Sequence, residues 1–244
     1  MVYDDINTHS LRSELSQERW FGGCSADLQD ALLVHGRLRR LIDGEALYSR
    51  EASAEHALFC VLEGAVCVGN TDAQGSPTLL VYLEPYHWFG ELPLIDNLPR
   101  LHDAVSDGPS LVLSVPHSRL LKWLDHHPVH WRDFAKLSAM KLRVAYQVLG
   151  EAGPLLQRFA RRLWLLAHGF GSRSDQPRLR LSLSQELMAN MLGASRQSIN
   201  SALQKLEQEG VIRQYYRGIE ILDLEALRLM AGLNTPSKLV RERE

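Results

Sequence analysis

The stretch 183–223 constrains this chain most, because it fits two short helices followed by a β-hairpin. Ser184 is a good N-cap for the first helix, and Gly193 supplies the break after it. Ser195 can cap a second helix. The apolar residues of that helix recur with helical spacing: Ile199, Ala202, Leu203 and Leu206. The sequence therefore predicts a helix-turn-helix.

Two short strands are predicted directly after this pair of helices. The segments 211–215 and 219–222 are rich in β-branched and aromatic side chains, and the Arg217-Gly218 pair between them suits a tight turn. The spacing predicts a two-stranded wing, so the whole segment has the pattern of a winged helix-turn-helix.

The outer face predicted for the second helix is rich in hydrogen-bond donors and amides, and it carries no acid before Glu207. Such side chains suit phosphate oxygens and base edges in the major groove of DNA. The residues predicted to contact DNA are Ser184, Ser195, Arg196, Gln197, Asn200, Ser201 and Lys205. The alternative is a ligand-binding or protein-interaction module in which the helix-turn-helix is only a scaffold with a solvated polar face.

Charge is divided unevenly along the chain. Residues 1–154 hold 13 basic and 20 acidic side chains, whereas residues 155–244 hold 14 basic and 9 acidic ones. The basic part also contains the predicted helix-turn-helix, and basic side chains supply the sequence-independent part of DNA affinity. The distribution favours an acidic sensing domain joined to a DNA-binding domain.

Between residues 46 and 116 the sequence changes to short apolar runs separated by Gly, Pro, Asp and Asn. These runs predict strands at 57–62, 65–69, 78–83 and 110–115. Several short strands at such spacing favour a sandwich or barrel, here expected as a β-roll of the jelly-roll type. A short helical region at 16–40 precedes it.

A long helix is predicted from Val129 to Glu151, opened by Pro128. Its apolar positions form a broad stripe: Phe134, Leu137, Met140, Val144, Ala145 and Val148. Such a stripe needs a long partner, and a second copy of the chain related by a two-fold axis supplies one. The alternative is that the same stripe packs against the chain's own β-roll.

The predicted fold class is α+β, with three successive parts. Residues 16–127 are expected to form an effector-sensing β-roll, residues 128–152 a dimerisation helix, and residues 153–232 a winged helix-turn-helix domain. Gly153-Pro154 is expected to act as a hinge. A helix at 155–168 opens the last domain, and its arginines are predicted to point outward: Arg158, Arg161 and Arg162.

No apolar run approaches the roughly 20 residues that a membrane-spanning helix needs, and the first residues are too polar for a signal peptide. A cytoplasmic location with no membrane partner is therefore expected. The three cysteines, Cys24, Cys60 and Cys67, lack metal-site spacing and are expected to be small core residues. Residues 1–15 and 234–244 are expected to be disordered.

This order of β-roll, long helix and winged helix-turn-helix resembles the cyclic-AMP receptor protein and fumarate–nitrate regulator (CRP/FNR) family of bacterial transcription regulators. Three stretches carry the resemblance: LFCVLEGAVCV at 58–68, FGELPLIDNLPR at 89–100, and SQELMANMLGASRQSINSALQKLEQEGVI at 184–212. The resemblance implies a homodimer that binds near-palindromic, double-stranded promoter DNA. It also implies a cyclic-nucleotide-binding-like sensor, a small-molecule effector, and RNA polymerase as a further partner.

The stretch 89–100 is similar to the family's phosphate-binding cassette, in which backbone N–H groups and an arginine hold the phosphate of a cyclic nucleotide. Leu101 stands where the resemblance places the arginine, and Arg100 comes one residue early. A shift of one residue turns an extended side chain to the other face, so weak or absent cyclic-AMP binding is expected, with another small effector or no effector as the alternative. A loop shorter by one residue would instead return Arg100 to the pocket. The expected effector site consists of Gly90, Glu91, Leu92, Arg100 and His102.

Other chemistries find little support in the sequence. The iron–sulfur branch of the family needs clustered N-terminal cysteines, and only Cys24 lies there, so no such cluster is expected. His126, His127 and His130 lie around the start of the long helix and are interpreted as helix-start residues, not metal ligands. No Ser/His/Asp set, paired-acid motif, P-loop or dinucleotide loop appears in a usable context, so we expect neither catalytic residues nor an enzyme.

Overall fold

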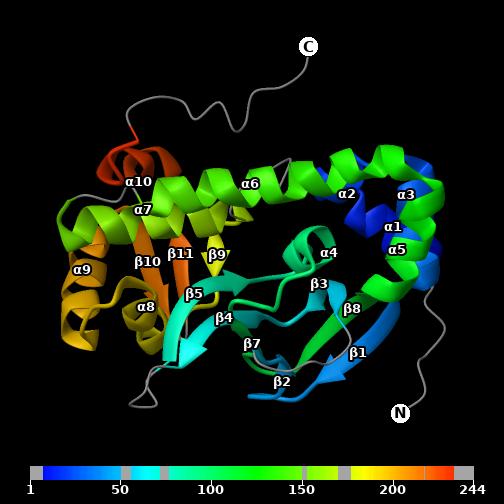
Figure 1. Ribbon diagram of the computed structural model, residues 1–244. Helices are drawn as coiled ribbons and strands as arrows, with labels where there is room; N and C mark the ends of the chain where they lie inside the picture. Colours follow the sequence, from blue (N-terminus) through cyan, green and yellow to red (C-terminus); the bar gives the residue numbers. More distant parts are fainter. Residues whose placement is uncertain are drawn as a thin grey trace. The chain divides into compact units, whose positions relative to one another are not determined.

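The computed structural model of this chain describes residues 8–50, 56–71, 77–149, 153–169, 177–216 and 218–233. The chain divides into two compact units, and the boundary between them falls after Leu142 (Figure 1). The first unit combines two sheets with several helices, and the second unit is mainly helical, so the fold class is α+β, as predicted.

The first unit contains a β-roll of two four-stranded sheets, and all pairings within them are antiparallel. One sheet has the order β1 (Arg37–Leu41), β8 (Ser110–Pro116), β3 (Ala57–Glu63) and β6 (Trp88–Phe89). The other has the order β2 (Ala46–Tyr48), β7 (Asp103–Ser106), β4 (Val66–Thr71) and β5 (Pro77–Leu83). The four predicted strands correspond to β3, β4, β5 and β8, whereas the other four strands were not predicted.

The position of strand β3 between two cores explains why its sequence is apolar throughout. Phe59 and Val61 point into a core between the two sheets, while Leu58 and Cys60 belong to a second core that includes helical residues. Successive side chains of a strand alternate between its faces, so a strand with a core on each side must be apolar throughout. Cys60 is fully buried and free, as expected for a small core residue.

Helices complete the second core of this unit: α1 (Thr8–Leu15), α2 (Arg19–Gly22), α3 (Ala26–His35), α4 (Leu92–Asp96), α5 (His117–His126), a 3-10 turn at Pro128–His130, and α6 (Trp131–Leu149). The expectation of disorder up to residue 15 is wrong for 8–15, because α1 forms there and buries Leu15 completely. Helix α5 was not predicted.

The predicted dimerisation stripe on α6 is corrected by the structure. Phe134 and Leu137 are buried in the second core of the chain's own roll, and Met140 packs against that core. The first part of the stripe therefore follows the alternative, packing within the chain. Val144 is also buried, with 9% of its surface exposed.

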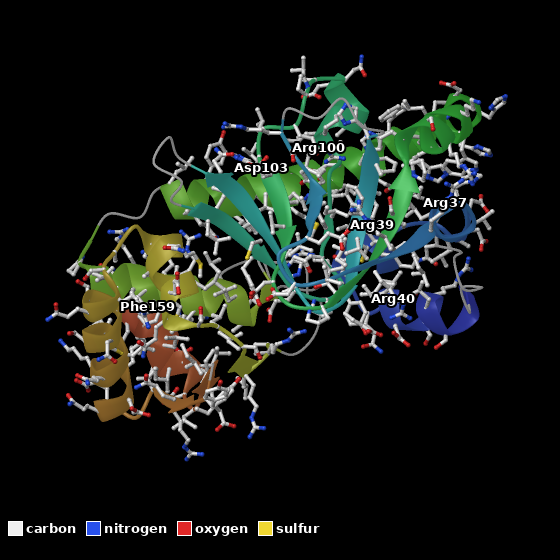
Figure 2. The ribbon with its side chains drawn as sticks, turned by 90° about the horizontal axis from the view of Figure 1, so that it is seen from below. Arg37, Arg39, Arg40, Arg100, Asp103 and Phe159 are labelled. Carbon is white, nitrogen blue, oxygen red and sulfur yellow. The ribbon has the colours of Figure 1, made fainter. Side chains whose placement is uncertain are left out.

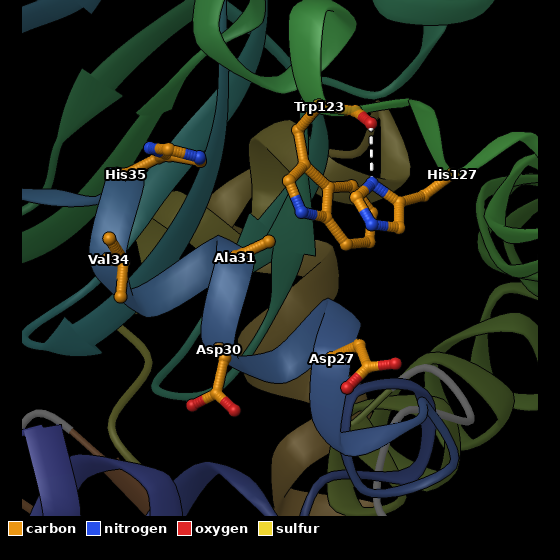
Figure 3. Close-up of a pocket in the computed structure, with 7 residues that line it drawn as sticks. All are labelled: Asp27, Asp30, Ala31, Val34, His35, Trp123 and His127. Carbon is orange, nitrogen blue, oxygen red and sulfur yellow. Dashed lines mark hydrogen bonds between the residues drawn. The ribbon is translucent and has the colours of Figure 1, made fainter. Parts of the chain in front are cut away.

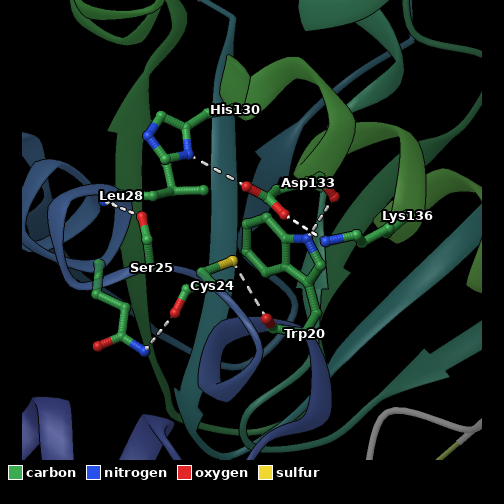
Figure 4. A network of polar contacts seen from close by, with 8 residues as sticks. Trp20, Cys24, Ser25, Leu28, His130, Asp133 and Lys136 are labelled. Atoms are coloured by element: carbon green, nitrogen blue, oxygen red, sulfur yellow. Dashed lines mark hydrogen bonds and ion pairs between the residues drawn. The ribbon is translucent and has the colours of Figure 1, made fainter. Parts of the chain in front are cut away.

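A polar network fixes the start of α6 against α2 (Figure 4). The Trp20 indole N–H donates to the carbonyl oxygen of Asp133 at 2.7 Å. The Asp133 carboxylate also bonds to His130 at 3.2 Å and to Lys136 at 2.7 Å. Cys24 donates through its thiol to the Trp20 carbonyl oxygen. His130 is thus buried and partnered, and is not a solvated helix-start residue.

The second unit contains helices α7 (Leu155–Ala167), α8 (Gln185–Leu192), α9 (Arg196–Gln208) and α10 (Leu224–Met230), together with a sheet of β9 (Arg180–Leu181), β10 (Ile212–Tyr215) and β11 (Gly218–Ile221). The sheet order β10-β11-β9 makes the wing three-stranded where two strands were predicted. Ile219 of β11 pairs with Gln214 on one side and with Leu181 on the other. Arg217 of the predicted turn lies outside the described residues.

The prediction that three arginines of α7 point outward is wrong. Arg162 is buried, with 6% of its surface exposed. Arg158 donates to the carbonyl oxygen of Leu192 at 2.8 Å, and Arg161 donates to that of Ala231 at 3.1 Å. Arg158 and Arg161 therefore each fasten a helix end inside the unit, and the other N–H donors of each guanidinium are not used by these bonds.

None of the helices in the described residues combines the length and the apolar character that crossing a bilayer requires.

Candidate nucleic-acid interface and effector site

The turn between α8 and α9 is fixed by two serine caps and a glycine. Ser184 accepts a hydrogen bond from the Leu187 N–H, and Ser195 accepts one from the Ser198 N–H, both at 3.1 Å. Gly193 ends α8 in the left-handed conformation, with φ of 58°. These are standard start and stop signals of helices, and they set the angle at which α9 leaves the turn.

Helix α9 has one buried and one exposed face. Ile199, Ala202, Leu203 and Leu206 are buried. On the opposite face Arg196, Gln197, Ser201 and Lys205 are exposed, and Asn200 is half-buried. The structure therefore brings five of the predicted DNA-contacting residues onto one face. Ser184 and Ser195 lie at the N-terminal ends of α8 and α9, where they act as caps.

The wing is attached to the C-terminal end of this helix. The Glu207 carboxylate accepts from both the backbone N–H and the side-chain amide of Gln214, each at 2.9 Å. These hydrogen bonds, the backbone one first, lower the pKa of Glu207. The Tyr215 hydroxyl in turn donates to the Leu181 carbonyl oxygen at 3.2 Å. The wing is thus held in a fixed position relative to α9, a relationship that the sequence did not predict.

The basic side chains of the wing are partly neutralised within the wing itself. Glu220 pairs with Arg180 at 3.0 Å and with Arg213 at 3.4 Å. Both arginines stay largely exposed, so the pairing is that of a screened surface network. Tyr216, at the tip of the wing, is 89% exposed.

In the first unit, Gly90 and Arg100 lie against each other in the β-roll. A Cβ atom at position 90 would lie 2.8 Å from the Ala57 carbonyl oxygen and 3.0 Å from the Arg100 guanidinium, too close for either. The backbone φ of Gly90, +90°, also favours glycine. Arg100 donates to the Ala57 carbonyl oxygen at 2.8 Å and lies 3.9 Å above the Tyr48 ring (Figure 2). Arg100 therefore points toward the cassette, as in the alternative in which a shorter loop returns its side chain to the pocket.

Burial shapes the charges beneath the cassette. Burial lowers the pKa of Arg100, although Tyr48 and Glu91 act in the opposite sense. Burial, followed by the nearby Arg100 charge, lowers the pKa of His117 to about 3, so this imidazole is neutral at ordinary pH. Nε2 of His117 is buried and has no hydrogen-bond partner among the described residues. The region thus combines one half-buried cation with a neutral imidazole.

Glu91 reaches its partner across the chain. Its side chain is almost completely buried and forms an ion pair with Lys141 of α6. Lys141 was not predicted, although the sequence holds a signal for it. Lys141 continues the helical spacing of Phe134 and Leu137 toward Val144, so a lysine falls on a face that is otherwise apolar. A charged residue in such a stripe indicates a buried counter-charge.

The other two predicted effector residues, Leu92 and His102, do not share the contacts of Gly90, Glu91 and Arg100 described above. Leu92 begins α4 and is 46% exposed. The His102 ring bonds to the Asn70 side-chain oxygen on β4 at 3.0 Å. The structure therefore brings Gly90 and Arg100 into contact, joins Glu91 to α6, and gives His102 a partner on the second sheet.

Two shallow grooves lie elsewhere on the described surface, between α3 and α5, and Figure 3 shows one of them. Trp123 and His127 stack there with ring centroids 4.2 Å apart. Asp27 and Asp30 line one groove, and Arg119 and Lys122 line the other. The described residues hold no group of three His, Cys, Asp or Glu side chains arranged for a metal ion. The groove is shallow and open, and we assign no ligand to it.

Two family profiles match this chain. The cyclic nucleotide-binding domain matches residues 38–127, and the Crp-like helix-turn-helix domain matches residues 157–230. Together they cover the β-roll, with α5 at its end, and the second unit from α7 to α10.

Among curated relatives, a CRP-like cAMP-activated global transcriptional regulator of Mycobacterium tuberculosis is 29% identical over 173 residues, covering 70% of this chain and 77% of the relative. The transcriptional regulator LdrP of Thermus thermophilus is 29% identical over 196 residues, covering 80% of this chain and 97% of the relative.

Solved structures agree with these matches. A transcriptional regulator of the CRP family from Thermus thermophilus is 27% identical, with a TM-score of 0.58, and the match covers 80% of this chain and 96% of that one. FixK2 from Bradyrhizobium japonicum, at 19% identity and a TM-score of 0.68, shares the fold over 80% of this chain and 96% of its own. The two profiles, the named relatives and the shared fold show that the chain belongs to the CRP/FNR family.

Proposed function

We propose that this protein is a transcription regulator that binds DNA through the exposed face of α9. The observation that carries the proposal is the pair of serine caps, which present Arg196, Gln197 and Ser201 on a rigid helix directly after a tight turn. Side chains near the start of a recognition helix are the ones that contact base edges in a major groove. Arg196 suits guanine, and Gln197 suits adenine.

The regulator acts as a homodimer on a near-palindromic site, with half-site centres about one helical turn apart. The surface for the second copy is a stripe on α6 that differs from the one predicted. It consists of apolar residues that are exposed on this helix: Ala135, Ala139, Leu142, Tyr146 and Leu149. Their spacing of four and three residues is that of a coiled-coil seam, so a second copy of α6 is the partner that fits.

The effector we propose is a small anion bound at Gly90 and Arg100, with Glu91 as a hydrogen-bond acceptor. Arg100 is inward, and a guanidinium that donates to one carbonyl oxygen keeps further N–H donors for an oxyanion. The relative described as cAMP-activated makes cyclic AMP the first effector to test. Leu92 and His102 remain members of the proposed site as its outer contacts.

Two further proposals come from family membership. We propose RNA polymerase as a protein partner and the cytoplasm as the place of action, because a regulator of transcription must meet both DNA and polymerase. The named relatives are transcription regulators, and we propose that this chain is likewise a regulator and not an enzyme.

The experiment that tests the function is a binding selection on random duplex DNA, run with and without cyclic AMP. Enrichment of a sequence with two inverted half-sites supports the proposal. Under the rival interpretation, a ligand-binding or protein-interaction module with a scaffold helix-turn-helix, no sequence would be enriched. Sedimentation of the same preparation separates a missing dimer from a missing DNA contact.

A further inference from the structure

Glu91 stands at the start of α4, but its side chain does not cap that helix. The side chain is 4% exposed, and its Oε2 atom forms an ion pair with the ammonium group of Lys141 on α6. A buried carboxylate needs an opposite charge, because the protein interior solvates it poorly. The ion pair therefore determines the direction in which the Glu91 side chain points.

This ion pair uses only one oxygen of the Glu91 carboxylate. Among the residues that the structure describes, the second oxygen, Oε1, has no hydrogen-bond partner. An ionised carboxylate accepts hydrogen bonds at both oxygens. Oε1 is thus the acceptor that Glu91 can offer to a ligand.

Arg100 supplies the cation of the same site. It lies against Gly90, the residue that precedes Glu91 in the chain, and the charges of Arg100 and Glu91 interact. A guanidinium binds oxyanions, whereas a carboxylate oxygen accepts a hydrogen bond from a hydroxyl group. The combination suits an anion that carries a hydroxyl group close to its negative charge.

We propose that Lys141 is a positioning residue of the effector site, which holds the Glu91 carboxylate so that Oε1 accepts a hydrogen bond from a hydroxyl group of the effector. Lys141 acts through Glu91 and does not itself bind the ligand. The inference rests on the function proposed above, and it narrows the effector class to hydroxyl-bearing anions.

The same ion pair joins the effector site to α6. Lys141 is directly followed by Leu142, the exposed residue at the centre of the proposed dimer seam. The hydroxyl group of the effector is therefore connected to this helix through two contacts, from the ligand to Glu91 and from Glu91 to Lys141.

Calorimetry on the full-length protein tests the positioning role, with cyclic AMP and its 2′-deoxy analogue, which lacks one hydroxyl group, as probes. The wild type should bind cyclic AMP about tenfold more tightly than the analogue, because the analogue loses a hydrogen bond to a charged acceptor. In Lys141→Met this ratio should fall toward one, because Glu91 loses the partner that orients it. Lys136→Met, which removes an ammonium group of α6 that pairs with Asp133, is the control and should keep the wild-type ratio.

A purely structural role of Lys141 would weaken the binding of both nucleotides equally. An unchanged ratio in Lys141→Met, or equal binding of the two nucleotides by the wild type, would therefore overturn the proposal. A higher ratio in Lys141→Met would also overturn it, because the lysine would then compete with the hydroxyl group for Glu91.

A second measurement needs no ligand. Chemical denaturation of wild type, Glu91→Gln, Lys141→Met and the double variant should show a coupling of about tenfold in the unfolding equilibrium constant. Additive effects would overturn the proposal. If Lys141→Met alone does not fold, recovery of the fold in the double variant supports the ion pair, and an unfolded double variant contradicts it.

The two measurements separate the inference from the function proposed above. If neither nucleotide binds to the wild type, cyclic AMP and its analogue are removed as effectors, and the denaturation experiment alone decides whether Lys141 holds Glu91.

Discussion

Arg158 of α7 donates a hydrogen bond to the carbonyl oxygen of Leu192, the last residue of the first helix of the helix-turn-helix. The last carbonyl groups of a helix have no partner within it, so a guanidinium there both satisfies an acceptor and compensates the negative end of the helix dipole. Arg158 thus positions α8 and, through the Gly193 turn, the recognition helix.

Replacing Arg158 with Ala should lower the free energy of unfolding of the second unit by about 1–3 kcal/mol, because a part-buried carbonyl loses a charged donor. Chemical denaturation followed by circular dichroism measures the loss. Arg196→Ala is the matched control, since Arg196 is exposed on α9 and no described contact depends on it. Equal stability of the two variants would mean that the Leu192 carbonyl is satisfied by water.

Arg196→Ala should instead weaken binding to the selected DNA site by about 1–3 kcal/mol and relax the base preference at one position of each half-site. The reason is that a bidentate contact to a base is lost while the fold stays intact. Fluorescence anisotropy on the selected site and on random DNA measures both effects. An equal loss on both DNAs would show that Arg196 contacts only the phosphate backbone.

Leu142→Glu should convert the dimer to a folded monomer with weak DNA binding. Leu142 is 51% exposed at the centre of the proposed seam, where a charge would meet its own copy. Sedimentation velocity checks the assembly, with Gln147→Glu, a position outside the seam, as the control. A stable dimer of Leu142→Glu would place the two-fold axis elsewhere.

Phe134→Ala should act on the same helix in a different way. Phe134 is completely buried in the core of its own roll, so its loss should cost about 3–5 kcal/mol of stability and leave the dimer seam unchanged. Thermal unfolding as a function of protein concentration separates the two effects. If Phe134→Ala shifted the monomer–dimer equilibrium more than Leu142→Glu does, our division of α6 into two faces would be incorrect.

Arg100→Met should weaken binding of an anionic effector by about tenfold or more, because the hydrogen bond to a charged donor is lost. Calorimetry with cyclic AMP and cyclic GMP as probes measures it. Arg40→Met, at an exposed position on β1, is the control (Figure 2). Binding that survives in Arg100→Met would locate the ligand away from Gly90.

Local sequence signals predicted those parts of the fold in which neighbouring residues determine the outcome. Ser184, Gly193 and Ser195 are short-range start and stop signals, and the structure places a helix end at each. The four longest apolar runs of the roll are strands. Strands β1, β2, β6 and β7 escaped prediction because they are short or charged, as in Arg37–Leu41, and their pairing partners lie far along the chain.

The candidate sites show the same limit. The exposed face of α9 followed from helical spacing alone, whereas the Glu91–Lys141 ion pair joins residues 50 positions apart. An apolar stripe on α6 was predicted correctly. Helical spacing alone, however, does not determine which of the two apolar faces of α6 packs against the chain's own roll. The direction of the Arg100 side chain could not be predicted for a related reason. A fixed strand register would turn this side chain outward, but Gly90 has no side chain and leaves room for it to lie inward.

The internal bonds of the basic unit bear on how its DNA affinity should respond to salt. Its net positive charge overstates the charge available to phosphates, because Arg162 is buried, Arg228 pairs with Glu225, and Arg180 and Arg213 pair with Glu220. Only cations that displace counterions from DNA contribute to the dependence of log affinity on log salt concentration. We therefore expect the DNA affinity of this protein to depend mainly on base contacts. It should stay bound to its preferred site at salt concentrations at which proteins with more free cations dissociate from DNA.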